Sequence, residues 1–123
     1  MTEQVKHFED LRIWQEARVL VKDVYGDFRE GDGWRDFGFK DQIQRAGVSI
    51  MNNIAEGFER ETDNDFAKFL DYAKGSCGEV RNMYYIAEDQ RYVDSESATK
   101  RREQARKISR GIASLAKHLR QKS

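Results

Sequence analysis

The chain has 123 residues, of which 36% are charged and 38% are hydrophobic, and its formal net charge is zero. The sequence excludes a membrane-spanning helix, because no apolar run approaches the ~20 residues that cross a bilayer, and an internal disulfide, because Cys77 is the only cysteine. A chain of this size fits one domain, residues 1–123, and we expect it in the reducing cytoplasm, since its first residues lack the apolar core of a signal peptide.

Four helices are predicted, because apolar residues recur along the chain at steps of three and four. They span about residues 8–28, 36–56, 64–90 and 95–119. Gly31-Asp32-Gly33 is the clearest break in the chain. We expect the aromatic pair that follows, Trp34 and Phe37, to plug one end of the core. Gly57 is expected to end the second helix in the left-handed conformation that glycine tolerates.

Short polar links join the later helices. Thr62 or Asp63 can cap the third helix, and Asp94 can cap the fourth. Gly75 and Gly78 lie inside the third helix, where each costs about 1 kcal/mol relative to alanine, so we expect close packing there in return. Four helices of similar length with short links predict an all-α fold, an up-down-up-down antiparallel four-helix bundle.

The sequence holds no recognisable catalytic or metal-binding constellation. Bundle di-iron sites use Glu-x-x-His pairs, and neither His7 nor His118 has a glutamate three positions before it. No histidine lies near Ser49 or Ser76 to activate a serine nucleophile. We therefore expect a protein that is not an enzyme and that needs no metal and no cofactor.

Polar residues cluster in the two central predicted helices, and they allow two interpretations. They could line a small-molecule or catalytic pocket. We favour a structural polar network of hydrogen bonds and ion pairs that fixes the register of the helices. The residues concerned are Arg45, Ser49, Asn53, Glu56, Ser76 and Glu79.

The fourth predicted helix is the strongest functional candidate. Residues 95–123 carry nine basic and two acidic side chains, whereas residues 1–94 carry 13 basic and 20 acidic ones. An outward basic stripe at helical spacing can follow a nucleic-acid backbone. It can equally be a solvated face, or pair with the acidic face of a neighbouring subunit. The candidate nucleic-acid-binding residues are Lys100, Arg102, Arg106, Lys107, Arg110, Lys117 and Arg120.

Aromatic side chains are abundant for a small bundle. Tyr72, Tyr84, Tyr85 and Tyr92 cannot all face inward, and at most one of the adjacent pair Tyr84 and Tyr85 points at the core. The others could stack on nucleic-acid bases or contribute to a subunit interface, where tyrosine is enriched.

Several motifs together resemble a known family. The opening Phe-x-x-Leu-x-x-Trp-x-x-Ala pattern is carried by Phe8, Leu11, Trp14 and Ala17. The most specific signature, Gln-x-x-Arg-Ala-x-x-Ser-Ile-x-x-Asn-Ile-Ala-Glu-Gly, is carried by Gln42, Arg45, Ala46, Ser49, Ile50, Asn53, Ile54, Ala55, Glu56 and Gly57. A third run is carried by Phe66, Phe69, Leu70, Ala73, Gly75, Ser76 and Glu79, and Tyr92 follows it before the last turn.

These motifs are similar to those of the four-helix-bundle family named for proteins encoded in intervening sequences of bacterial 23S ribosomal RNA genes. Many relatives have proline where this chain has Met51. The resemblance implies a homopentamer, because related bundles, including the accessory protein of diversity-generating retroelements, form five-fold rings. In that accessory protein a basic surface binds nucleic acid and a reverse transcriptase. The resemblance implies no catalytic residue.

The sequence thus predicts a non-enzymatic, oligomeric nucleic-acid-binding or adaptor protein that uses a basic face of its fourth helix, with RNA or DNA and a protein as possible partners. The alternative is a structural protein–protein interaction module without nucleic-acid binding.

Overall fold

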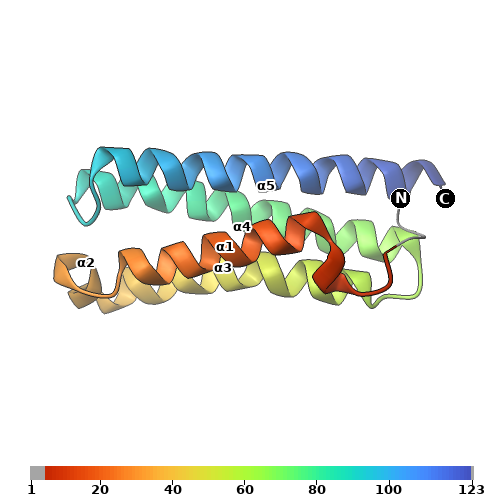
Figure 1. Cartoon of the computed structure of the whole chain (residues 1–123), viewed down its shortest axis with the longest axis horizontal. Helices are drawn as coiled ribbons and strands as arrows, with labels where there is room; N and C mark the ends of the chain where they lie inside the picture. The colour runs from red at the N-terminus through yellow and green to blue at the C-terminus, as the bar shows by residue number, and fades with distance from the viewer. Residues whose placement is uncertain (1–4, 123) are drawn as a thin grey trace.

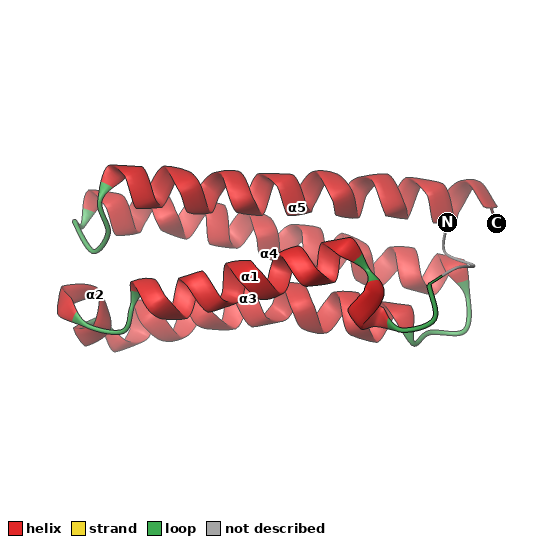
Figure 2. Cartoon of the chain, in the orientation of Figure 1, coloured by secondary structure: helices red, strands yellow, loops and turns green. Residues whose placement is uncertain are grey.

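The computed structural model describes residues 5–122, and no strand occurs in this part of the chain. The predicted all-α class is confirmed (Figure 2). The elements are a 3-10 helix, η2 (Phe8–Asp10), and the α-helices α1 (Arg12–Asp27), α2 (Gly31–Arg35), α3 (Phe37–Phe58), α4 (Asp63–Asp89) and α5 (Ser95–Lys122).

The four long helices pack side by side, each running opposite to the one before it (Figure 1). Helix α4 packs against both α3 and α5, and α1 closes the bundle by packing against the same two helices. The core contains fully buried aliphatic side chains from every long helix, such as Leu20, Ile50, Leu70 and Ile112. Burial of each contributes about 1.5–3 kcal/mol relative to exposure.

The start of the bundle differs from the single helix predicted over residues 8–28. Leu11 has an extended backbone, with φ −71° and ψ 128°, between η2 and α1. Its side chain is buried in the core, and the Phe8 ring packs against Trp14 at 5.4 Å between centroids. The bend at Leu11 therefore brings the Phe8 ring back against α1, which a continuous helix over residues 8–28 would not do.

The prediction that Trp34 and Phe37 plug the core is wrong. Both rings are exposed, contact each other edge to face, and share the Lys40 ammonium, which lies 4.6 Å and 4.9 Å from their centroids. The residue that packs inward from the short helix α2 is Gly33. A Cβ at this position would lie 2.9 Å from the Phe28 ring, so only glycine lets α2 approach the bundle this closely.

Gly57 also has a different role from the predicted helix stop. It lies inside α3, one residue before the end of the helix, and is buried. A Cβ built on Gly57 would lie 2.8 Å from Phe69 Cβ and 3.2 Å from the backbone oxygen of Phe66. The missing side chain allows the end of α3 to approach the start of α4.

Replacing Gly57 by alanine should lower the free energy of unfolding by about 1–3 kcal/mol, because the new methyl group meets backbone and Cβ atoms that cannot rotate away. Denaturant unfolding measures the change. The matched control is Gly38→Ala, also in α3, where nothing lies within 4 Å of the built Cβ. That variant should keep or gain stability, by at most about 1 kcal/mol. Equal effects of the two substitutions would contradict the steric explanation.

The predicted caps of the later helices are present. Thr62 Oγ1 accepts a hydrogen bond from the backbone N–H of Asp65 at 3.1 Å, and Asp94 Oδ1 accepts one from Ser97 at 2.7 Å. The hydrogen bonds from the backbone and the side chain of Ser97 lower the pKa of the Asp94 carboxyl, because they favour its charged form. Each cap satisfies a backbone donor that the helix itself leaves unpaired.

The close packing predicted at the glycines of α4 is not found, so this prediction is wrong. Both Gly75 and Gly78 are exposed, and no atom lies within 4 Å of a Cβ built on either one. Between them, Cys77 is fully buried, and burial raises the pKa of its thiol to about 12. Among residues 5–122, no close packing at either position offsets the helix-propensity cost of the two glycines.

Candidate nucleic-acid interface

The six polar residues predicted to form one network are divided by the fold. Ser49, Asn53 and Ser76 do interact between α3 and α4. Ser76 Oγ donates to Ser49 Oγ at 2.9 Å, and the Asn53 amide donates to the hydroxyl and the carbonyl of Ser49 at 3.0 Å and 2.9 Å. These bonds are half-buried and hold the middle of α3 against α4.

The other three predicted members lie at the surface. Arg45 pairs with Asp41 of its own helix at 2.8 Å, and Glu79 accepts a weak hydrogen bond from Gln42 at 3.4 Å. Glu56 is exposed and lines an open groove on the outer side of α3. Although Arg45, Ser49 and Glu56 share a helix face, only its central part touches α4, so the long side chains at its two ends reach water.

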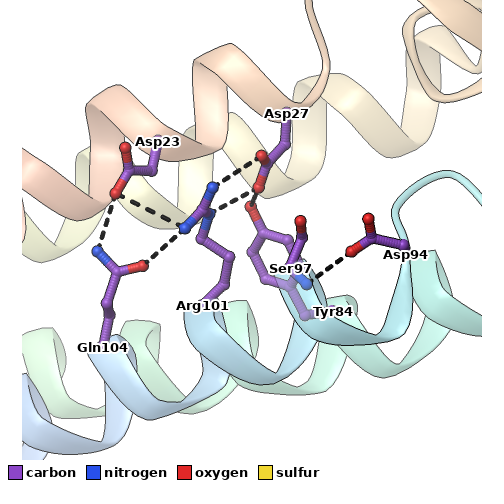
Figure 3. A network of polar contacts seen from close by, with 7 residues as sticks. All are labelled: Asp23, Asp27, Tyr84, Asp94, Ser97, Arg101 and Gln104. Atoms are coloured by element: carbon purple, nitrogen blue, oxygen red, sulfur yellow. Dashed lines mark hydrogen bonds and ion pairs between the residues drawn. The ribbon is translucent and has the colours of Figure 1, made fainter.

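The main polar network of the molecule joins α1, α4 and α5 (Figure 3). Arg101 donates from Nε and Nη2 to the two carboxylate oxygens of Asp27, at 2.8 Å and 3.0 Å. The Tyr84 hydroxyl donates to the same carboxylate at 2.7 Å. Gln104 links Asp23 to Arg101 through bonds of 2.9 Å and 3.2 Å. In the sequence, Arg101 interrupts the apolar register of α5 between Ala98 and Ala105.

This network is built to hold helices together. The fork of Arg101 matches the Asp27 carboxylate with two parallel hydrogen bonds, the strongest geometry for such a pair. Burial raises the pKa of the Tyr84 phenol above its ordinary value, and the negative charge of Asp27 adds to this. Tyr84 therefore stays a neutral hydrogen-bond donor to Asp27.

The cations of α5 are divided between two flanks of the helix. Lys107 forms an ion pair with Glu16 of α1, at 3.3 Å. Arg102, on the opposite flank, pairs with Glu88 of α4 at 2.9 Å, and its side chain is only 14% exposed. The prediction that Arg102 faces outward is therefore wrong, whereas the side chain of Lys107 remains 60% exposed. Turning Lys107 toward α1 and Arg102 toward α4 follows from their different angles around the helix.

The remaining predicted cations vary in how far they are neutralised. Arg120 binds the carboxylate of Asp71 in α4 with two hydrogen bonds, and Arg106 lies 3.8 Å from Glu103 of its own helix. Exposed cations without a hydrogen bond or ion pair to any residue from 5 to 122 include Lys100, Arg110 and Lys117.

Helix α4 adds two cations that the sequence did not predict as site residues. Lys74 is exposed and lines one shallow groove together with Lys117 of α5. Arg81 is half-buried, and its Nε is buried without a hydrogen-bond partner in the described part of the chain. Both charges lie close enough to Cys77 to oppose the rise in its pKa caused by burial. Neither Lys74 nor Arg81 has an ion pair with any residue from 5 to 122.

Two interhelical pairs fix how these residues face one another. Asp71–Arg120 and Glu88–Arg102 bracket the segment, and because α4 and α5 are antiparallel, residues 74–85 run beside residues 106–117. We call this surface the α4–α5 face. It consists of Lys74, Gly78, Arg81 and Tyr85 from α4 and Arg106, Arg110, Ala113 and Lys117 from α5.

The α4–α5 face is basic because acidic residues are missing from it. Between Asp71 and Glu88 the only acidic residue of α4 is Glu79, which contacts α3, and no acidic residue follows Glu103 in α5. A surface with several unneutralised cations and no intervening carboxylate attracts a polyanion. The sequence does indicate that the α4 residues of this face share one side of the helix, since Lys74, Gly78, Arg81 and Tyr85 recur at steps of four, three and four.

Within residues 5–122, no three side chains of His, Cys, Asp or Glu are grouped so that they could hold a metal ion. None of the described helices combines the length and apolarity needed to cross a membrane.

The family model described as 23S rRNA-intervening sequence protein matches residues 9–114. This span includes the polar network and nearly all of the α4–α5 face. No curated protein matches the chain.

Proposed function

The chain belongs to the family of 23S rRNA-intervening sequence proteins, and on this premise we propose that it is a non-enzymatic, oligomeric nucleic-acid-binding protein of the cytoplasm. The α4–α5 face is its contact surface. The observation that carries the proposal is the set of cations on this face that form no ion pair with any residue from 5 to 122, namely Lys74, Arg81, Arg110 and Lys117. The family name, which refers to ribosomal RNA, makes RNA the first ligand to test.

Such a face would bind through phosphate contacts. Lysine and arginine side chains that neutralise phosphates release counterions, so the affinity falls steeply with salt and depends little on sequence. The proposed role is accordingly one of holding or bridging nucleic acid. It requires no catalytic group.

The direct test is a fluorescence anisotropy titration with a structured RNA and with a DNA of equal length, at low and moderate salt. We expect binding of both at low salt, with a negative slope of log affinity against log salt. Absence of binding at low salt, or an affinity that does not respond to salt, would rule the proposal out.

A second candidate function, a protein–protein interaction module, is favoured by the side of α4 that faces away from α5. Tyr72 is exposed there, one turn before the open backbone at Gly75, and Ile86 is exposed about three turns after it. Exposed apolar side chains next to a helical glycine suit close packing of another helix. We propose this side as the contact through which copies of the chain assemble, and the resemblance points to five copies.

Light scattering tests the assembly. The wild-type mass should exceed that of one chain, and Gly75→Arg should reduce it, because the new side chain occupies the open space beside Tyr72. Lys22→Glu, on the exposed side of α1, is the control and should leave the mass unchanged. A monomeric wild type would refute the proposed assembly and leave the nucleic-acid proposal to its own test.

A further inference from the structure

Tyr85 stands out among the tyrosines of the chain by its surroundings. Its side chain is 52% exposed, in the last turns of α4. The guanidinium of Arg102 lies over one side of its ring, 4.0 Å from the centroid. The ring thus presents a flat apolar surface to water while a cation lies against its other side.

The supporting cation is itself fixed in place. Arg102 Nη1 donates to Glu88 at 2.9 Å and Nη2 donates to Thr99 at 3.2 Å. A guanidinium held at two points restrains the ring that rests on it, which lowers the entropy lost when a ligand stacks there. Tyr85 is therefore an ordered platform and not a freely rotating side chain.

The position of the platform links it to the basic face. Tyr85 lies one helical turn beyond Arg81 on the same side of α4, at the end of the α4–α5 face. Between Lys74 and Arg81, exposed Gly78 leaves open space into which a ligand backbone could approach the helix. A row of cations that ends in a stacking surface is the arrangement by which proteins hold single strands.

We propose that Tyr85 stacks against an unpaired base, so that the preferred ligand of the α4–α5 face is a single-stranded stretch of nucleic acid. This inference rests on the proposed nucleic-acid-binding function. A base inside a duplex has both faces covered by its neighbours, whereas an unpaired base offers a free face to an aromatic ring. The phosphates of the same strand then lie along Arg81, Arg110 and Lys74.

The test compares one labelled single strand of about 12 nucleotides, within the range that such grooves bind, with its duplex. Tyr85→Ala should weaken single-strand binding roughly 5- to 150-fold, as expected for loss of one stacked base. Duplex binding should stay within about twofold, since the duplex engages only the cations. Tyr85→Phe should retain the wild-type affinity for the single strand.

Controls separate this inference from the function on which it rests. Tyr25→Ala removes a similarly exposed ring, 42% against 52%, from α1, and should change neither affinity. Lys74→Glu should weaken the single strand and the duplex alike. Suppose that Lys74→Glu weakens binding, but Tyr85→Ala weakens neither ligand or weakens both equally. Tyr85 then does not stack on a base, and the α4–α5 face remains the proposed contact surface.

Two further outcomes are decisive. If the wild type binds neither ligand, the proposed function itself fails. If Tyr85→Ala lowers the mass of the assembly in light scattering, Tyr85 belongs to a subunit contact, and the stacking role is overturned.

Discussion

Replacing Arg101 by alanine should lower the free energy of unfolding by about 3 kcal/mol. The side chains of Arg101 and Asp27 are only 15% and 12% exposed, and Arg101 supplies two of the three hydrogen bonds that the Asp27 carboxylate accepts. Without the guanidinium, a negative charge remains between three helices with only the Tyr84 hydroxyl to solvate it. An uncompensated buried charge costs far more than the net worth of the intact pair.

Urea unfolding followed by circular dichroism measures the Arg101→Ala change. The matched control is Arg45→Ala, which removes the same kind of side chain from the exposed pair with Asp41 and should cost at most about 0.5 kcal/mol. Removing both partners as Asp27→Leu with Arg101→Met should restore part of the loss, since the buried Asp27 charge is then absent; only part is expected, because Asp23 still loses its 3.8 Å ion pair with Arg101. A cost below about 1 kcal/mol for Arg101→Ala would mean that water already solvates Asp27 in the folded protein.

Reversing three charges of the α4–α5 face should reduce affinity for nucleic acid by at least roughly 100-fold at low salt. The changes are Lys74→Glu, Arg110→Glu and Lys117→Glu, all at exposed positions without an ion pair to residues 5–122, so the fold should remain intact. Each lost phosphate contact also lowers the salt slope by about 0.7–0.9, which gives a decrease of roughly 2–3 for the triple variant.

Two controls sharpen this charge-reversal experiment. Lys22→Glu changes a basic residue of α1 outside the face and should have little effect. Lys107 was predicted from the sequence to bind nucleic acid, but it pairs with Glu16 of α1. Lys107→Glu should therefore weaken binding less than Lys74→Glu does. Equal losses for all of these variants would indicate a response to net charge alone and contradict a localised site.

Local features of the fold followed from the sequence, because they depend on residues close together in the chain. The helices follow from apolar spacing, and the caps at Thr62 and Asp94 need partners only three residues away. The helix stop predicted at Gly57 was wrong, and the packing role of Gly33 was not predicted, because each glycine makes room for a ring or backbone of another element. No local pattern reveals such a neighbour.

The candidate site was predictable only in part for the same reason. The basic character of α5 is visible in the sequence, but its division between two flanks depends on Glu16 and Glu88, which lie in other helices. The sequence does not show that Lys74 and Arg81 lie beside the cations of α5, because this depends on the register of α4 against α5. Arg101 interrupts an apolar pattern, and its partner Asp27 is 74 residues away.

That separation has a consequence for the order of folding. Helices α4 and α5 are joined by a short turn and pack along their length, so their contacts form early, whereas the Asp27–Arg101 pair must close a loop of 74 residues. We expect α1 to dock late, after the transition state for folding. Loss of the pair would then accelerate unfolding much more than it slows folding, and the lifetime of the native bundle would be set by how firmly its first helix is held to its last.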